Sequence, residues 1–138
     1  MGIRVVLDSN IWISYIIQGK MTDIVAMATV GNVEFVRCEK LTAEISEVLA
    51  RPKFEKYLKE PLSSYIALYE KITTPIKISS MFSGCRDPKD NFLFDLAYQS
   101  KAKYLVSGDN DIVETPVVSP LEVVSLARFR EIYIQRLN

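Results

Sequence analysis

Four carboxylates stand where the chain passes from one kind of structural element to another. Asp8 follows the apolar run "RVVL", and Asp109 follows the apolar run "YLV" after a short turn. A strand that is apolar at every position is usually covered on both faces of a parallel sheet, and such folds bind ligands beyond the carboxyl ends of their strands. The two aspartates are therefore expected at one edge of a sheet. The competing roles are capping of the next helix for Asp8 and turn formation in "SGDN" for Asp109.

Glu44 and Asp90 are the helical candidates of the set. Glu44 lies about 85° from the centre of the apolar stripe of its helix and Glu47 about 145°, so Glu44 is expected at the rim and Glu47 in solvent. Asp90 stands where a loop enters a helix, and a helix N-terminus can project a carboxylate into a cleft. The competing roles are a solvated side chain for Glu44 and helix N-capping for Asp90.

Three further aspartates lie close to these candidates in the sequence. Asp95 is on the same helix as Asp90 but points about 140° away from the apolar stripe, so it is expected at the surface. Asp87, in "RDP", is expected to shape the loop. Asp111 is expected either to assist the site or to cap the segment after it.

A cluster of four carboxylates would repel itself unless cations were bound, because like charges at short range interact strongly. The chain has no histidine, and this excludes histidine acid–base chemistry and zinc sites with histidine ligands. Ligation by oxygen atoms alone favours Mg²⁺ or Mn²⁺. Such a centre suits phosphodiester hydrolysis, in which metal ions activate water and stabilise negative charge.

The composition is that of one globular domain spanning residues 1–138. Hydrophobic residues make up 49% and charged residues 25%, with no formal net charge. Asp8 comes too early for a signal peptide, and no apolar run reaches the ~20 residues of a membrane span, so a cytoplasmic protein without membrane contact is expected. Cys38 and Cys85 are far apart and are expected to be free thiols.

The elements that must position the carboxylates alternate between strand and helix. This alternation predicts an α/β fold of three layers, α/β/α, with a mostly parallel central sheet. Strands are expected at 3–8, 33–38, 76–80, 103–109 and 117–119. Helices are expected at 9–18 ending at Gly19, 23–30 capped by Thr22, 39–58 interrupted near Pro52, 62–72, 91–102, and from a capping box at Ser119, Pro120 and Glu122 through 135.

The segments "VVLDSNIWIS", "LTAEISEVLARPKF", "CRDPKDNFLFDLA", "YLVSGDNDI" and "VVSPLEVV" occur in this order. Together they resemble the PIN domain family and, within it, the toxin components of toxin–antitoxin systems, the VapC-like ribonucleases. By this resemblance Asp8, Glu44, Asp90 and Asp109 match the acidic quartet that holds Mg²⁺ or Mn²⁺. The resemblance also assigns Asn10 to the polar position that supports the site. Ser107 stands where PIN domains often carry Thr or Ser before the last aspartate.

The same resemblance implies a metal-dependent endoribonuclease that cleaves single-stranded RNA, forms homodimers and is inhibited by an antitoxin protein. The helix that carries Trp12 and Tyr15 is unusually apolar, which packing in the core explains for the most part, and the two residues are also candidates for a dimer or antitoxin surface. Basic residues near the acidic helix and on the final helix are candidates for phosphate contacts, although a solvated charged face also explains them. They are Lys89, Lys101, Lys103, Arg128, Arg130 and Arg136.

Two other functions compete with a ribonuclease. Phosphohydrolases of the haloacid dehalogenase type also begin with an aspartate after a strand, but they need a second aspartate where this chain has Asn10. A non-catalytic PIN-like module would bind RNA or a protein and use the acidic cluster only structurally. Cleavage of single-stranded RNA that depends on a divalent metal separates this module from the enzyme.

Overall fold

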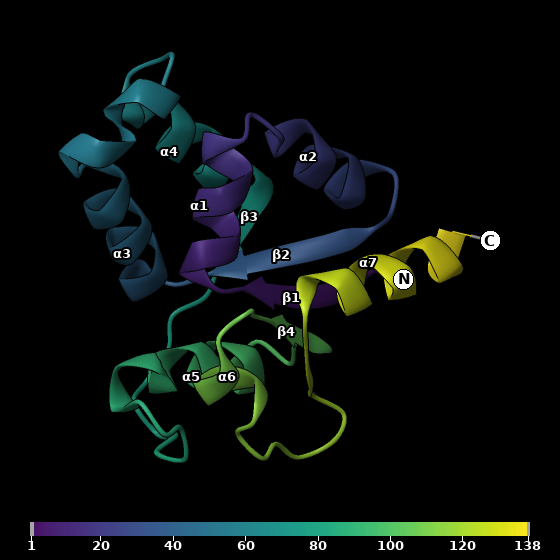
Figure 1. Ribbon diagram of the computed structural model, residues 1–138. Coiled ribbons are helices and arrows are strands. Elements are labelled where there is room, and N and C mark those ends of the chain that lie inside the picture. Colours follow the sequence, from purple (N-terminus) through teal and green to yellow (C-terminus); the bar gives the residue numbers. More distant parts are fainter. Residues whose placement is uncertain (1, 138) are drawn as a thin grey trace.

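A computed structural model describes residues 2–137 and contains one five-stranded sheet between layers of helices (Figure 1). Residues 1 and 138 of the predicted domain lie outside the described part. All strand pairs are parallel, and the order across the sheet is β3-β2-β1-β4-β5. The strands are β1 (Ile3–Leu7), β2 (Val33–Arg37), β3 (Thr73–Pro75), β4 (Tyr104–Val106) and β5 (Glu122–Val124).

Helices cover both faces of this sheet. In Figure 1, α5 and α6 lie on one side of the strands, and α1 and α2 lie on the other. The predicted three-layer α/β/α fold is therefore confirmed, and its sheet is parallel throughout. The helices are α1 (Ser9–Ile17), α2 (Met21–Thr29), α3 (Glu39–Leu49), α4 (Leu62–Ile72), α5 (Asn91–Gln99), α6 (Asn110–Val113) and α7 (Leu126–Leu137), with short 3₁₀ helices η1 (Pro52–Tyr57) and η2 (Pro88–Asp90).

The strand order reverses between β1 and β4. From β1 the chain proceeds outward to β2 and β3, whereas from β4 it proceeds in the opposite direction to β5. Leu7 is in register with Val106, so these two strands end side by side. A crevice outside the carboxyl ends of strands at such a reversal is where open α/β sheets bind ligands. The residues that follow Leu7 and Val106 therefore occupy the expected binding position.

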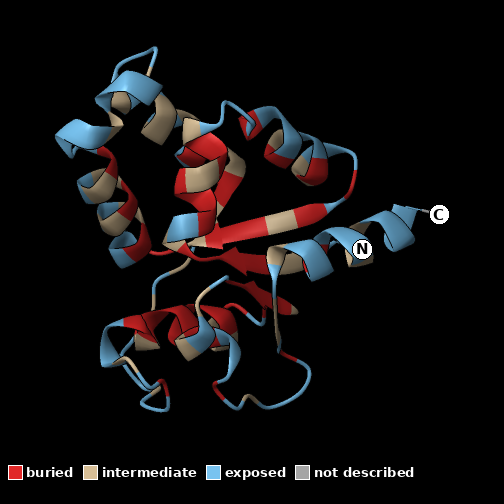
Figure 2. Ribbon diagram, in the orientation of Figure 1, coloured by how far each residue is buried: buried red, intermediate tan, exposed pale blue. Residues whose placement is uncertain are grey.

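The burial pattern explains why β1 and β4 carry continuous apolar runs. Val5, Val6 and Leu7 of β1 are buried, as are all residues of β4, because helices cover both faces. Figure 2 shows buried residues concentrated on the strands and on α1 and α5, while α7 is largely exposed. The chain leaves α1 through Gly19, whose positive φ of 68° is favoured by glycine, as expected for the end of this helix.

Trp12 and Tyr15 are core residues, so the expectation of a docking surface is wrong. Trp12 is fully buried and packs edge-on against Phe35 and Tyr69, with ring centroids 5.8 Å and 4.9 Å apart. Tyr15 is only 4% exposed. The apolar character of α1 follows from its position between the sheet and other helices, and it presents neither aromatic ring to a partner.

Two predicted strands lie at different positions. The third strand is Thr73–Pro75, directly after α4, because Thr73 aligns with Phe35 of β2, and the expected 76–80 has no regular structure. The last strand is Glu122–Val124, aligned with β4, and the expected 117–119 is irregular. In each case two neighbouring segments could form the strand. Hydrogen bonding with the adjacent strand of the sheet determines which of them does so.

Two predicted helix starts are also wrong. The final helix begins at Leu126, and the Arg128 backbone N–H donates to Ser125 Oγ, because Glu122 is committed to β5. Helix α2 begins at Met21, which is 7% exposed, and so includes Thr22 within its first turn. The predicted interruption near Pro52 is confirmed, since α3 ends at Leu49 and a 3₁₀ helix starts at Pro52.

Cys38 and Cys85 are both free and buried, as expected. Within residues 2–137, no helix combines the length and the apolar character that a membrane crossing requires.

Candidate active site

Asp8 lies at the carboxyl end of β1 and is only 3% exposed. One oxygen, Oδ1, accepts a 2.9 Å hydrogen bond from the Ile11 backbone N–H and so caps α1. The other oxygen, Oδ2, accepts a hydrogen bond from the Ser107 hydroxyl. Capping of α1 uses only Oδ1, so it is compatible with a second role of Asp8 in the acidic site.

The pKa of the Asp8 carboxyl is raised above its ordinary value of 3.8. Burial is the largest cause, and the hydrogen bonds from Ser107 and Ile11 oppose it. The negative charges of Asp109 and Glu44 raise this pKa further. Two other members of the predicted quartet are thus electrostatic neighbours of Asp8.

Ser107 connects the ends of β1 and β4. Its hydroxyl donates to Asp8, and its oxygen accepts a 3.0 Å hydrogen bond from the Asp109 backbone N–H. Asp109 Oδ1 in turn accepts from the Asp111 backbone N–H at 2.9 Å and caps α6. The turn that was the competing role for Asp109 therefore also fixes this half-buried carboxylate beside Asp8.

Asp90 is 7% exposed and occupies the N-cap position of α5, but its side chain makes no capping hydrogen bond. Its Oδ2 is buried without a hydrogen-bond partner in the described structure. Burial, followed by the charges of Asp87, Asp109 and Glu44, raises the pKa of this carboxyl to about 6, and Lys89 opposes the rise. The predicted alternative of side-chain capping is wrong for Asp90. An unsatisfied buried carboxylate oxygen is costly, and a cation or a proton would compensate it.

Glu44 is half-buried on α3, whereas Glu47 is exposed, as the helical geometry predicts. The charge of Glu44 raises the pKa of both Asp8 and Asp90. Glu44 therefore faces the same region as the two aspartates. The four quartet positions converge from β1, α3, the start of α5 and the turn after β4.

The four carboxylates do not form a closed metal cage. Over residues 2–137, no group of three or more Asp, Glu, Cys or His side chains is arranged to hold a metal ion. The charges of Asp109 and Glu44 nevertheless raise the pKa of both Asp8 and Asp90, so these two carboxylates lie near both aspartates. The oxygen-only donor set and the unpartnered Asp90 Oδ2 fit a hard divalent cation.

The supporting residues occupy different surroundings. Asn10 is exposed on the first turn of α1, and its predicted supporting role remains a prediction. Asp111 does not cap α6, since Asp109 does. Its carboxylate instead accepts a 3.1 Å bond from Arg86. Sequence reasoning missed Arg86, although its position four residues before Asp90 places a cation in the same loop.

Asp95 is buried, so its predicted surface position is wrong. It is 3% exposed, and its Oδ1 accepts hydrogen bonds from the backbone N–H groups of Met81 and Phe82 at 3.1 and 2.8 Å. The segment before η2 folds over this side of α5, which helix periodicity alone does not reveal. Asp87 accepts from the Lys89 N–H and shapes the loop, as predicted.

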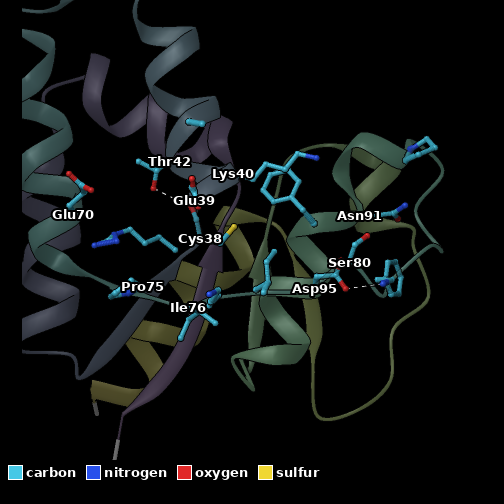
Figure 3. Close-up of a pocket in the computed structure, with 17 residues that line it drawn as sticks. Cys38, Glu39, Lys40, Thr42, Glu70, Pro75, Ile76, Ser80, Asn91 and Asp95 are labelled. Atoms are coloured by element: carbon cyan, nitrogen blue, oxygen red, sulfur yellow. Dashed lines mark hydrogen bonds between the residues drawn. The ribbon is translucent and has the colours of Figure 1, made fainter.

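A groove adjoins the acidic region. It has a volume of about 1220 Å³ and lies between the start of α3, the start of α5 and the segment after β3. Figure 3 shows Cys38, Glu39 and Thr42 on one side of it and Asn91 and Asp95 on the other. The lining residues Ala43 and Asn91 directly precede Glu44 and follow Asp90, respectively. The groove therefore lies beside α3 and the start of α5, the elements that carry Glu44 and Asp90.

The basic residues suggested by the sequence are spread over the molecule. Lys101 and Lys103 precede β4 and therefore lie toward the amino-terminal ends of the strands, whereas Asp109 lies at the carboxyl ends. Lys89, in contrast, belongs to η2 next to Asp90. The groove instead brings in Arg37, Lys40 and Lys77, which sequence reasoning did not select. Lys40 could have been selected from the sequence, because it precedes Glu44 by one helical turn and therefore lies on the same side of the predicted helix.

Comparison with known proteins gives one family and one relative. The family model described as PIN domain matches residues 4–111, which include all four quartet positions. Uncharacterized protein MJ1680 of Methanocaldococcus jannaschii is 29% identical over 118 residues, which cover 80% of this chain and 74% of the relative. The name of this relative states no activity. No solved structure matches the chain.

Proposed function

The chain belongs to the PIN domain family, whose members are generally nucleases, and on this premise we propose that it is a metal-dependent endoribonuclease acting on single-stranded RNA. The observation that supports the proposal is that Asp8 and Asp109 follow the paired strands β1 and β4 at the switch point, where the charges of Asp109 and Glu44 raise the pKa of both Asp8 and Asp90. The buried, unpartnered Oδ2 of Asp90 is an available ligand atom in this region.

The four carboxylates are the residues that would hold Mg²⁺ or Mn²⁺. Divalent ions supply charge that activates water and stabilises the oxygens that attack and leave phosphorus. Asp8 is the most firmly positioned ligand, since Ile11 and Ser107 bind both of its oxygens. Ser107 also fixes the backbone of Asp109. In this proposal, water attacks phosphorus in line and the products carry 5′-phosphate and 3′-hydroxyl ends.

Cleavage of end-labelled single-stranded RNA tests the proposal directly. The wild-type protein should cleave in Mg²⁺ or Mn²⁺ and not after chelation. Asp8→Asn and Asp109→Asn should each reduce the rate by at least about 100-fold, since asparagine retains the capping hydrogen bond while removing the charge. Circular dichroism should show that both variants remain folded.

Two glutamates of α3 form a matched pair for the same assay. Glu44→Gln should lose cleavage, whereas Glu47→Gln, on the exposed face of the same helix, should retain it. Near-native turnover by Asp8→Asn, Asp109→Asn or Glu44→Gln would refute the assigned roles.

A non-catalytic PIN-like module is the second candidate. The absence of a closed metal cage within residues 2–137 favours it. This module predicts RNA or protein binding without cleavage in either metal. The same assay therefore separates the two functions.

The proposal also includes a toxin role, a homodimer and an antitoxin protein that inhibits the cleft. It rests on the resemblance to VapC-like ribonucleases. Induced expression should arrest growth, and co-expression of a small protein encoded next to this chain should restore it. Unaffected growth in the absence of such a neighbour contradicts the toxin role but leaves the nuclease proposal intact.

A further inference from the structure

The groove beside the quartet contains three cationic side chains without ionic partners. Arg37, Lys40 and Lys77 line it, and within residues 2–137 no carboxylate oxygen lies within 4.0 Å of their charged nitrogens. Arg86, four residues before Asp90, instead bridges Asp111 and Glu114, and Lys89 pairs with Asp87. The positive charge available next to the acidic region is thus concentrated in the groove.

The three carboxylates that line the groove form no ion pair with its three cations within the described residues. Asp95 is committed to the backbone N–H groups of Met81 and Phe82. Glu39 and Glu70 are exposed, so water screens their charges. No carboxylate therefore competes with an incoming anion for the three cations at close range.

One of the cations is positioned by an aromatic ring, and another has a buried donor without a partner among the described residues. The Lys40 ammonium lies over the Phe92 ring, 5.0 Å from its centroid, and this contact links α3 to α5 without neutralising the charge. Arg37 Nε is buried and has no hydrogen-bond partner in the described structure. An unpaired buried donor is unfavourable, and an arginine guanidinium forms strong charge-assisted hydrogen bonds with phosphate.

The size and the walls of the groove indicate an extended ligand. Its volume of about 1220 Å³ exceeds the roughly 300–1,000 Å³ of most small-molecule pockets. Apolar side chains, including Ile76, Ile78 and Phe82, line it together with the cations. Cations that follow a phosphate backbone, combined with apolar surfaces that contact bases, are typical of sites for single-stranded nucleic acid.

We propose that this groove binds the sugar-phosphate backbone of the RNA strand as it leaves the acidic region, with Arg37, Lys40 and Lys77 contacting phosphates. The position of the strand rests on the proposed function, because the groove lies between α3 and the start of α5, which carry Glu44 and Asp90. Binding by the groove itself does not require cleavage. The chain has no net charge, so local attraction at this groove compensates for the repulsion between RNA and the quartet.

Salt-dependent binding tests this proposal. Fluorescence anisotropy would measure the affinity for a labelled single-stranded RNA in Mn²⁺, using the non-cleaving Asp8→Asn protein as the background. Adding Lys40→Ala and Lys77→Ala should weaken binding by about tenfold or more. The slope of log K against log salt should become shallower by about 1.4, or about 0.7 for each lost phosphate contact on a single strand.

The matched control removes two lysines far from the groove. Lys20 follows α1, and Lys103 precedes β4, so both lie toward the amino-terminal edge of the sheet. Lys20→Ala with Lys103→Ala changes the net charge by the same amount as the groove variant. This control should leave the salt slope unchanged. Equal slopes for the groove variant, the control and the parent protein would overturn the proposal.

Two further measurements separate this proposal from the nuclease function and from other ligands. If wild-type protein cleaves RNA but the groove variant binds and cleaves as the control does, the groove proposal fails while the nuclease stands. If no protein cleaves RNA but the slope difference remains, the groove proposal stands and the nuclease fails. An acidic peptide that competes as effectively as single-stranded RNA would overturn the choice of RNA as the ligand.

Discussion

At the scale of single residues, the acidic site contains buried carboxylates, and hydrogen bonds offset only part of the cost of burying them. Asp8 receives hydrogen bonds on both oxygens, whereas Asp90 leaves Oδ2 buried without a partner. The pKa of Asp90 is accordingly raised to about 6, mainly by burial and then by neighbouring negative charges. In the proposed nuclease, this arrangement lowers the stability of the metal-free protein and provides Asp90 Oδ2 as a ligand atom, and perturbed pKa values are common at functional sites.

Asp90→Asn should stabilise the metal-free protein at pH 7. The folded-state pKa is about 6 against an ordinary value of 3.8. The folded protein therefore binds more protons in this window, and the stability contribution of Asp90 falls as the pH rises from about 4 to 6. The free energy of unfolding at pH 7 should increase by about 1 kcal/mol in the variant, because the neutral amide removes the cost of burying a charged carboxylate.

Thermal unfolding in chelator at pH 7 and pH 4 measures this effect. The gain from Asp90→Asn should disappear at pH 4, where Asp90 is protonated in the folded wild-type protein. Exposed Glu47→Gln is the control and should change the melting temperature little at either pH. A variant less stable than wild type at pH 7 in chelator contradicts the account of Asp90.

At the scale of elements, each carboxylate is placed by a strand end or a helix end. Parallel pairing of β1 with β4 brings Asp8 beside Ser107 although 99 positions separate them in the chain. Helix α5 has two roles, since its N-cap position carries Asp90 and its middle carries Asp95, which binds the loop before η2. That loop segment also supplies part of the groove wall.

Asp95→Ala should destabilise the protein by about 2 kcal/mol, because it leaves the N–H groups of Met81 and Phe82 without their acceptor. Urea unfolding followed by circular dichroism gives the free energy of unfolding. Asp95→Asn keeps a carbonyl acceptor and should cost less. Equal stability of the alanine variant and wild type contradicts the structural role of Asp95.

At the scale of the whole molecule, the sequence predicts the layers and the binding edge well. The apolar runs of β1 and β4 identify buried strands, and the residues that follow them, Asp8 and Asp109, lie at the switch point. Helical periodicity separates Glu44 from Glu47 for the same reason, since one side of α3 is buried. These inferences succeed because each depends on a local pattern that the fold preserves.

Features set by long-range contacts are not predictable in this way. Asp95 is buried by a segment of irregular structure, and no periodic pattern marks where such a segment packs. The last strand is Glu122–Val124 because these residues pair with β4, whereas "VVS" at 117–119 has similar strand propensity. The groove combines residues from β2, α3, α5 and the segment after β3, so its cations become a group only in the folded chain.

The most direct test of the account is calorimetric titration of Mn²⁺ into the wild-type protein and into Asp8→Asn, with Glu47→Gln as the charge-matched control. The account predicts saturable binding by wild type and Glu47→Gln, and binding at least about tenfold weaker by Asp8→Asn, because one ligand charge is lost from a shared site. Absence of Mn²⁺ binding by wild type, or equal affinity of wild type and Asp8→Asn, would contradict convergence of the four carboxylates on one divalent-ion site.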